Sequence, residues 1–164
     1  MKKQAIILVT IDTDATPGSS STKHDEGQML SSDTGKYVPT SKFEIHVVPS
    51  DLEHDKSNLD LDVRTSLAHE LGHVVGYLSG SKVTMNDPRS KPQGNRWTDD
   101  PGGAVRASEK EAWDIAQVID PGIDMNNAKR ALDTYNDPSM DVQFKMAIIA
   151  DALHALIGEE DTVN

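Results

Sequence analysis

The stretch that decides the fold is "LAHELGHVVGYLSG", residues 67–80, in which two histidines stand four positions apart and a glutamate follows the first. Positions i and i+4 lie on one face of an α-helix, so His69 and His73 share a direction if this segment is helical. The sequence therefore predicts a helix over residues 62–78, in which Gly72 leaves space between the two histidines. Its apolar positions recur at helical spacing and are Leu67, Leu71, Val74, Val75 and Leu78.

His69, Glu70 and His73 together have the chemistry of a metal site. Imidazole nitrogens bind zinc at about 2.0–2.1 Å, and both rings can reach one ion from successive turns. Glu70 is rotated by about 100° from His69 around the helix axis, which places it beside the ion. A carboxylate there can take a proton from a water that zinc has acidified and pass it to a leaving amine. We therefore expect one Zn²⁺ per chain, with Glu70 as the catalytic base.

Such a site needs a third ligand, and one source is the metzincin pattern, HExxHxxGxxH followed by a methionine turn. Gly76 occupies the glycine position, and Met85 is the candidate methionine. Ser79 stands where the third histidine belongs, and no histidine follows before His154. In this interpretation the chain is a degenerate metzincin-like protease. Gly76 and Ser79 are better explained as the places where the helix loosens and ends.

The other source is a carboxylate on a second helix, which gives two histidines and one glutamate with an open position. Glu109 and Glu111 are the candidates, 36 and 38 residues beyond His73. The segment "SEKE" has the form of a capping box, which predicts a helix beginning at Ser108. Periodicity does not choose between the glutamates, because each lies at one edge of the apolar stripe. Glu111 already has the capping role, so Glu109 is the favoured ligand.

The segments "LAHELGH" and "SEKEAWDIAQVIDP" together resemble the ImmA/IrrE family of metallo-endopeptidases, small HExxH proteins of bacteria and their mobile elements. The resemblance covers about residues 42–121. It implies a gluzincin-like enzyme that hydrolyses peptide bonds in a regulatory protein. It also implies four site residues, namely the zinc ligands His69, His73 and Glu109 and the general base Glu70.

Strand patterns precede the histidine helix. Residues 5–11, "AIILVTI", form a β-branched apolar run typical of a buried strand. Residues 42–50 alternate, with Phe43, Ile45 and Val47 on one face, and predict a half-buried strand. This strand is the candidate for binding a substrate backbone by edge pairing. Residues 12–42, rich in Ser, Thr, Asp and Gly, predict a long flexible loop.

Further helical patterns follow the histidine helix. Residues 79–103 are rich in Pro and Gly and predict an irregular connection. The helix from Ser108 is expected to stop at residues 120–122, and residues 122–158 predict a helical C-terminal part. Strands first and helices after indicate the α+β class. We expect a single zincin-like domain over residues 1–164, with a short sheet packed on the HExxH helix.

Composition excludes several kinds of partner. The net charge of −11 argues against nucleic acid or an anionic membrane, because both are polyanions. The absence of cysteine excludes disulfides and thiolate ligands and fits a reducing compartment. No stretch is long enough to span a bilayer. We expect a cytoplasmic protein with a protein or peptide substrate and of undetermined oligomeric state. The alternative is a non-catalytic zinc-binding interaction protein on the same scaffold.

Overall fold

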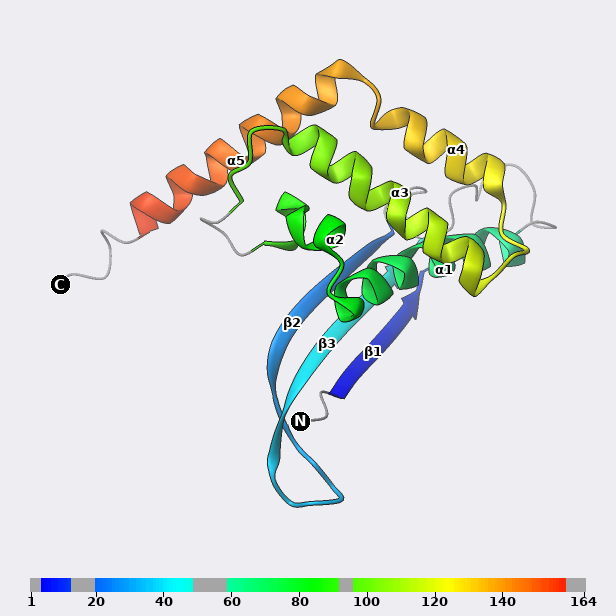
Figure 1. Cartoon of the computed structure of the whole chain (residues 1–164), viewed down its shortest axis with the longest axis vertical. Coiled ribbons are helices and arrows are strands. Elements are labelled where there is room, and N and C mark those ends of the chain that lie inside the picture. Colours follow the sequence, from blue (N-terminus) through cyan, green and yellow to red (C-terminus); the bar gives the residue numbers. More distant parts are fainter. Residues whose placement is uncertain (1–3, 13–19, 49–58, 92–95, 159–164) are drawn as a thin grey trace.

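The chain folds as three strands followed by helices (Figure 1). The computed structural model describes residues 4–12, 20–48, 59–91 and 96–158. The predicted α+β class is confirmed. The elements, in chain order, are β1 (Gln4–Ile11), β2 (Ser21–Leu30), β3 (Tyr37–Val47), α1 (Leu59–Ser79), α2 (Lys82–Asn86), the 3-10 turn η2 (Pro88–Ser90), α3 (Pro101–Ile119), α4 (Met125–Thr134) and α5 (Pro138–Gly158).

The middle strand of the sheet is β3, which pairs in parallel with β1 and antiparallel with β2. Phe43, Ile45 and Val47 are buried as their alternation predicts, and they pack against Val74 of α1. Because β3 has a partner on both sides, it has no free edge. The expectation that this strand binds a substrate backbone by edge pairing is therefore wrong, and the edge strand that packs against α1 is β2.

The flexible loop expected over residues 12–42 is wrong for the part that the structure describes. Residues 13–19 lie outside the described ranges, but Ser21–Leu30 form β2, and β3 begins at Tyr37. Backbone pairing with β3 along its whole length holds β2 in place. Most of its side chains are exposed, so the strand needs no apolar alternation, and the sequence carries none. Its far end and the following turn extend away from the body (Figure 1).

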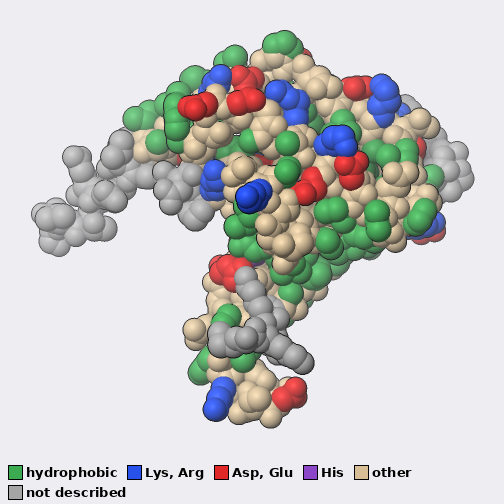
Figure 2. All heavy atoms as spheres, in the orientation of Figure 1, with side chains coloured by type: hydrophobic (Ala, Val, Ile, Leu, Met, Phe, Trp, Pro, Cys, Tyr) green, Lys and Arg blue, Asp and Glu red, His purple; other side chains and the backbone are tan. Residues whose placement is uncertain are grey.

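β1 exists as predicted but is not buried. Ile7, Leu8, Val9 and Ile11 are 40–50% exposed, and hydrophobic side chains gather on the lower rim of the body where β1 runs (Figure 2). The reason is its position. β1 is an outer strand, whereas α1 packs across β3 and β2. The apolar run correctly predicted that this segment is a strand, but it did not predict that the strand is partly exposed.

The helices stack on one side of the sheet, with α3 packed on α1. Gly72 permits this packing, because a Cβ atom there would lie 2.2 Å from the carbonyl oxygen of Ala112 in α3. The space at Gly72 thus admits the α3 backbone and is not a gap between the histidines. The helix also does not loosen at Gly76, whose missing side chain lets Thr84 of α2 approach. It ends at Ser79, as expected.

The start of α3 differs from the prediction. The helix begins at Pro101, seven residues before Ser108, and Asp100 caps it by accepting a hydrogen bond from the Gly103 amide at 2.8 Å. Ser108 is buried inside the helix, so the predicted capping box is wrong. Pro fits the first helical turn, but the two glycines after it weaken the helical pattern of the sequence.

The remaining helices agree more closely with the sequence. α3 stops at Ile119 with Asp120 as its C-cap, and α4 and α5 lie within the predicted helical part at residues 122–158. The connection at residues 79–103 is less irregular than expected, because it contains α2 and η2. Among the described residues, no helix combines the length and apolarity needed to cross a membrane.

We predict that Gly72→Ala destabilises the protein by about 1–3 kcal/mol, the usual cost of overpacking a core. The added methyl group would collide with the backbone of Ala112, which cannot rotate away as a side chain could. Gly27→Ala is the matched control, because nothing lies within 4 Å of a Cβ atom at that position. Chemical denaturation measures both. Equal stability of the two variants would contradict the proposed tightness of the α1–α3 contact.

Candidate metal centre

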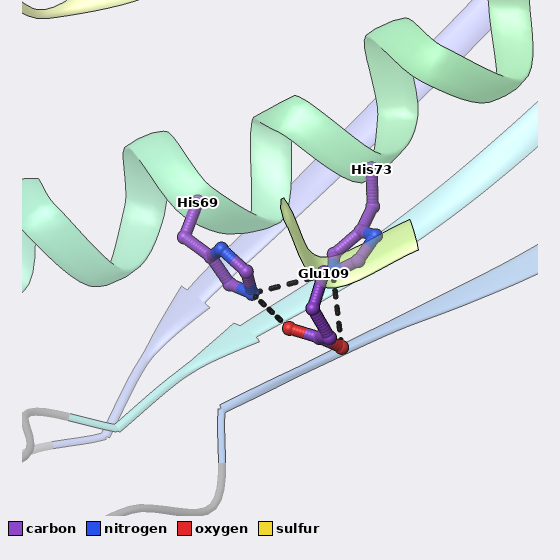
Figure 3. A group of neighbouring side chains, drawn as sticks. All are labelled: His69, His73 and Glu109. Atoms are coloured by element: carbon purple, nitrogen blue, oxygen red, sulfur yellow. Dashed lines mark hydrogen bonds and ion pairs between the residues drawn. The ribbon is translucent and has the colours of Figure 1, made fainter. Parts of the chain in front are cut away.

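Three side chains from two helices converge at the middle of α1. His69 and His73 project from successive turns of α1, and Glu109 reaches them from α3 (Figure 3). The two histidine Nε2 atoms are 3.2 Å apart. Glu109 Oε2 lies 3.1 Å from His69 Nε2, and Glu109 Oε1 lies 3.6 Å from His73 Nε2. The potential ligand atoms all lie within 4.8 Å of one another.

These separations suit a zinc ion. Zinc takes nitrogen and carboxylate oxygen ligands at about 2.0–2.2 Å in tetrahedral geometry, which puts neighbouring ligand atoms roughly 3.3–3.5 Å apart. The His69–His73 and His69–Oε2 separations of 3.2 and 3.1 Å lie just below that range. The nearest Glu109 oxygen to His73 is the other one, Oε1, at 3.6 Å, just above it. Two imidazoles and one carboxylate are also a donor set that catalytic zinc sites use. The residues therefore fit the group that the sequence predicts, and metal binding itself stays a prediction.

Glu109 is a buried carboxylate that stays charged. Burial by itself raises the pKa of Glu109, but hydrogen bonds from His69 and His73 and the charge of Arg89 outweigh it and hold the pKa far below its usual range. Arg89 donates from Nη2 to Glu109 Oε1 at 2.6 Å. A carboxylate that is deprotonated at neutral pH can serve as a metal ligand without first losing a proton.

Glu70 lies in the same cleft and has a specific partner. Its side chain is buried, and its Oε2 atom accepts a hydrogen bond from Thr22 Oγ1 at 2.6 Å. Thr22 belongs to β2, so the strand that the sequence analysis missed contributes directly to the site. The sequence carries no alternating signal here, because residues 20–26 are all polar. Thr22, His24 and Glu26 share one face only once the segment is a strand.

The centre opens into a cleft of about 900 Å³. Ser20 and the first six residues of β2, Ser21 to Glu26, line one part of it, and Arg89, Lys91, Arg96 and Tyr135 contribute to the rest. An aromatic cluster lies beside β2, in which the His24 ring is 4.8 Å from Phe43 and 3.9 Å from Tyr77 between centroids. The cleft therefore joins an extended backbone edge, an apolar surface and the candidate metal centre.

The alternative ligands lie elsewhere. Glu111 accepts hydrogen bonds from Ser81 Oγ at 2.6 and 2.8 Å and from Thr84 Oγ1 at 2.7 Å. Ser79 Oγ donates to the Gly76 carbonyl at 2.9 Å, and Met85 is exposed. Ser79 and Met85 are not among the residues that line the cleft. The structure thus groups Glu109, and neither Glu111 nor Ser79, with the two histidines.

The Nδ1 side of the His69 ring is held by packing, while Nε2 faces Glu109 and His73. Its ring lies against Trp113, with 4.1 Å between ring centroids and an interplanar angle of 31°. Within the described residues, His69 Nδ1 and Trp113 Nε1 are buried without a hydrogen-bond partner. Metal-binding histidines commonly donate their second ring N–H to a carboxylate or carbonyl. Here the indole ring fixes the plane of the imidazole instead.

Comparison with known proteins gives no further support for a family. No protein-family model matches the chain, and no curated protein or solved structure matches it either. The resemblance to ImmA/IrrE metallopeptidases therefore stays an expectation from sequence motifs.

We predict that Glu111→Ala destabilises the protein by about 1–3 kcal/mol, because it leaves two partly buried hydroxyls without their acceptor. Thermal denaturation of the metal-free protein measures this loss. Glu44→Ala is the control, since the Glu44 side chain is exposed and pairs with the similarly exposed side chain of Lys42 on the same strand. A Glu111 variant as stable as the Glu44 variant would contradict the structural role of Glu111.

Proposed function

We propose that this protein is a zinc-dependent metallopeptidase of the zincin type. The observation that carries the proposal is the grouping of His69, His73 and Glu109 at zinc-like separations, with Glu70 in the same cleft. His69, His73 and Glu109 would hold one zinc ion and leave a fourth position open, as catalytic zinc sites require. A structural zinc site is closed by four protein ligands, and the described residues supply three at this place.

The residues have distinct roles in peptide hydrolysis. When bound, zinc supplies Lewis acidity, which polarises the peptide carbonyl and makes a water more acidic. Glu70 accepts the proton of the attacking water and then donates it to the amide nitrogen, so the C–N bond breaks as an amine leaves. Thr22 fixes the carboxylate of Glu70 through its 2.6 Å hydrogen bond.

The cleft favours an extended peptide as the substrate. β2 is an edge strand along the cleft, and an edge strand binds an extended chain through backbone hydrogen bonds. A folded domain has few free extended segments, so the substrate would be a linker, a terminus or an unfolded region. The resemblance to ImmA/IrrE proteins adds that the target is a regulatory protein, and the cysteine-free sequence fits action in the cytoplasm.

The first test combines zinc stoichiometry, measured by elemental analysis of the purified chain after dialysis, with zinc affinity, measured by competition with a chelator. We expect one zinc per chain in the wild type. Glu109→Gln should weaken zinc binding by more than the roughly 10–100-fold that losing an outer partner of a ligand costs. Glu111→Gln is the matched control and should retain zinc, because Glu111 contacts α2 instead. A Glu109 variant with undiminished zinc affinity would rule out the two-histidine, one-glutamate site.

The second test separates catalysis from zinc binding alone. We expect Glu70→Gln to keep one zinc per chain but to lower cleavage of a fluorescence-quenched peptide library by about 10²–10⁴-fold, the usual contribution of a general base. Mass spectrometry of the products identifies the cleaved bonds. A zinc-loaded wild type that cleaves no faster than Glu70→Gln would instead favour the non-catalytic interaction protein.

A further inference from the structure

The two oxygens of Glu109 have different surroundings. Oε2 lies 3.1 Å from His69 Nε2, on the side where the histidines converge. Oε1 accepts a hydrogen bond from Arg89 Nη2 at 2.6 Å and lies 3.6 Å from His73 Nε2. A carboxylate can bind a metal through one oxygen or through both. Because Oε1 already accepts from the Arg89 cation, Oε2 is the oxygen better placed to approach an ion closely.

Arg89 is itself held in place by Asp87, two residues before it. Asp87 is buried, and its Oδ2 atom accepts from Arg89 Nη2 at 2.7 Å. Its Oδ1 atom accepts from Arg89 Nε at 3.1 Å and from the Arg89 amide at 2.8 Å. The planar guanidinium suits such paired contacts with little further loss of entropy. Asp87 thus sets the direction of Arg89 before any ligand is present.

Other groups complete the surroundings of Arg89. The Tyr135 ring lies 6.0 Å from the guanidinium carbon, and Arg106 of α3 fixes the Tyr135 carbonyl through a 3.0 Å hydrogen bond. The positive charge of Arg89 is balanced locally by Asp87 and Glu109. The trio therefore carries one net negative charge toward the histidines and does not repel a cation.

We propose that Arg89, oriented by Asp87, is a positioning residue that makes Glu109 a one-oxygen zinc ligand. This inference rests on the proposed metal centre and adds a role for a pair outside the three ligands. The hydrogen bond from Arg89 to Oε1 keeps the carboxylate from binding the ion through both oxygens and so from filling two coordination positions. The position left open is the one that a water or a substrate carbonyl needs in a catalytic site.

A purely structural ion pair would behave differently. If Arg89 only joined η2 to α3, it would compete with the metal for Glu109, and its removal would leave zinc affinity unchanged or make it higher. If Arg89 positions the ligand, its removal lowers zinc affinity and changes the number of ligand atoms. The direction of the change in affinity therefore separates the two roles.

The experiment measures the zinc dissociation constant of the full chain by competition with a chromophoric chelator at neutral pH. We expect Arg89→Ala to weaken zinc binding by about 10–100-fold, as is typical when an outer partner of a ligand is lost. Arg89→Lys should fall in between, because one ammonium lacks the fork that contacts both carboxylates. Asp87→Asn should also weaken zinc binding. Arg64→Ala is the control, since Arg64 forms a comparable pair with Asp120 on the surface.

Replacing zinc by Co²⁺ gives a second measurement, the visible absorption of the bound ion. This absorption would not change if the role of Arg89 were only structural. Four-coordinate Co²⁺ absorbs visible light more strongly than five- or six-coordinate Co²⁺. We therefore expect an intense band in the wild type and in Arg64→Ala, and a weaker band in Arg89→Ala once both Glu109 oxygens can bind. Circular dichroism checks that each variant is folded, and Arg89→Lys serves if Arg89→Ala is not.

The outcomes distinguish this inference from the proposed function. A wild type that binds no zinc overturns the metal centre and this inference with it. Normal zinc binding in the wild type, with unchanged or tighter binding and an unchanged cobalt spectrum in Arg89→Ala, overturns the role of Arg89 alone. Weaker zinc binding together with a weaker cobalt band supports it.

Discussion

The contact between Gly72 and the backbone of Ala112 sets the distance between α1 and α3, and the candidate metal centre depends on that distance. The histidines stand on α1 on either side of Gly72, and Glu109 stands on α3 one turn before Ala112. A side chain at Gly72 would push the helices apart and move the carboxylate away from both imidazoles. The close packing of the two helices therefore also sets the positions of the three candidate ligands.

The same packing explains why two glutamates two positions apart have different partners. Residues i and i+2 on a helix differ by about 200° in direction. When Glu109 points at the histidines, Glu111 must point away from them. Thr84 of α2 and the N-cap residue Ser81 supply two hydroxyls there. Arg89 comes from the turn just beyond α2 and binds Glu109. Each carboxylate therefore has its own set of donors, and the connection between α1 and α3 provides both.

Sequence patterns predicted the elements whose signal is local. The HExxH helix, the inward face of β3 and the helical C-terminal part follow from periodicity, because their apolar residues repeat at the period of the element. The stripe predicted on α1 is only partly buried, however: Val74 is buried, but Val75 and Leu78 are 42% and 44% exposed. β2 could not be found this way. It is held by backbone pairing with β3 and directs polar residues such as Thr22 into the cleft. The early start of α3 was hidden for a related reason, since Pro101 and two glycines weaken a helical pattern that tertiary contacts with α1 support.

The sequence by itself determined that His69 and His73 share a helix face with Glu70 beside them, because those relations depend only on helix geometry within one element. It also reduced the candidates for a third metal ligand to two glutamates, Glu109 and Glu111. Only the tertiary structure decided which glutamate meets the histidines, that β2 forms the edge of the cleft, and that Arg89 donates to Glu109. These relations join residues far apart in the chain. They are set by how helices pack and strands pair, and no local pattern of residues encodes that.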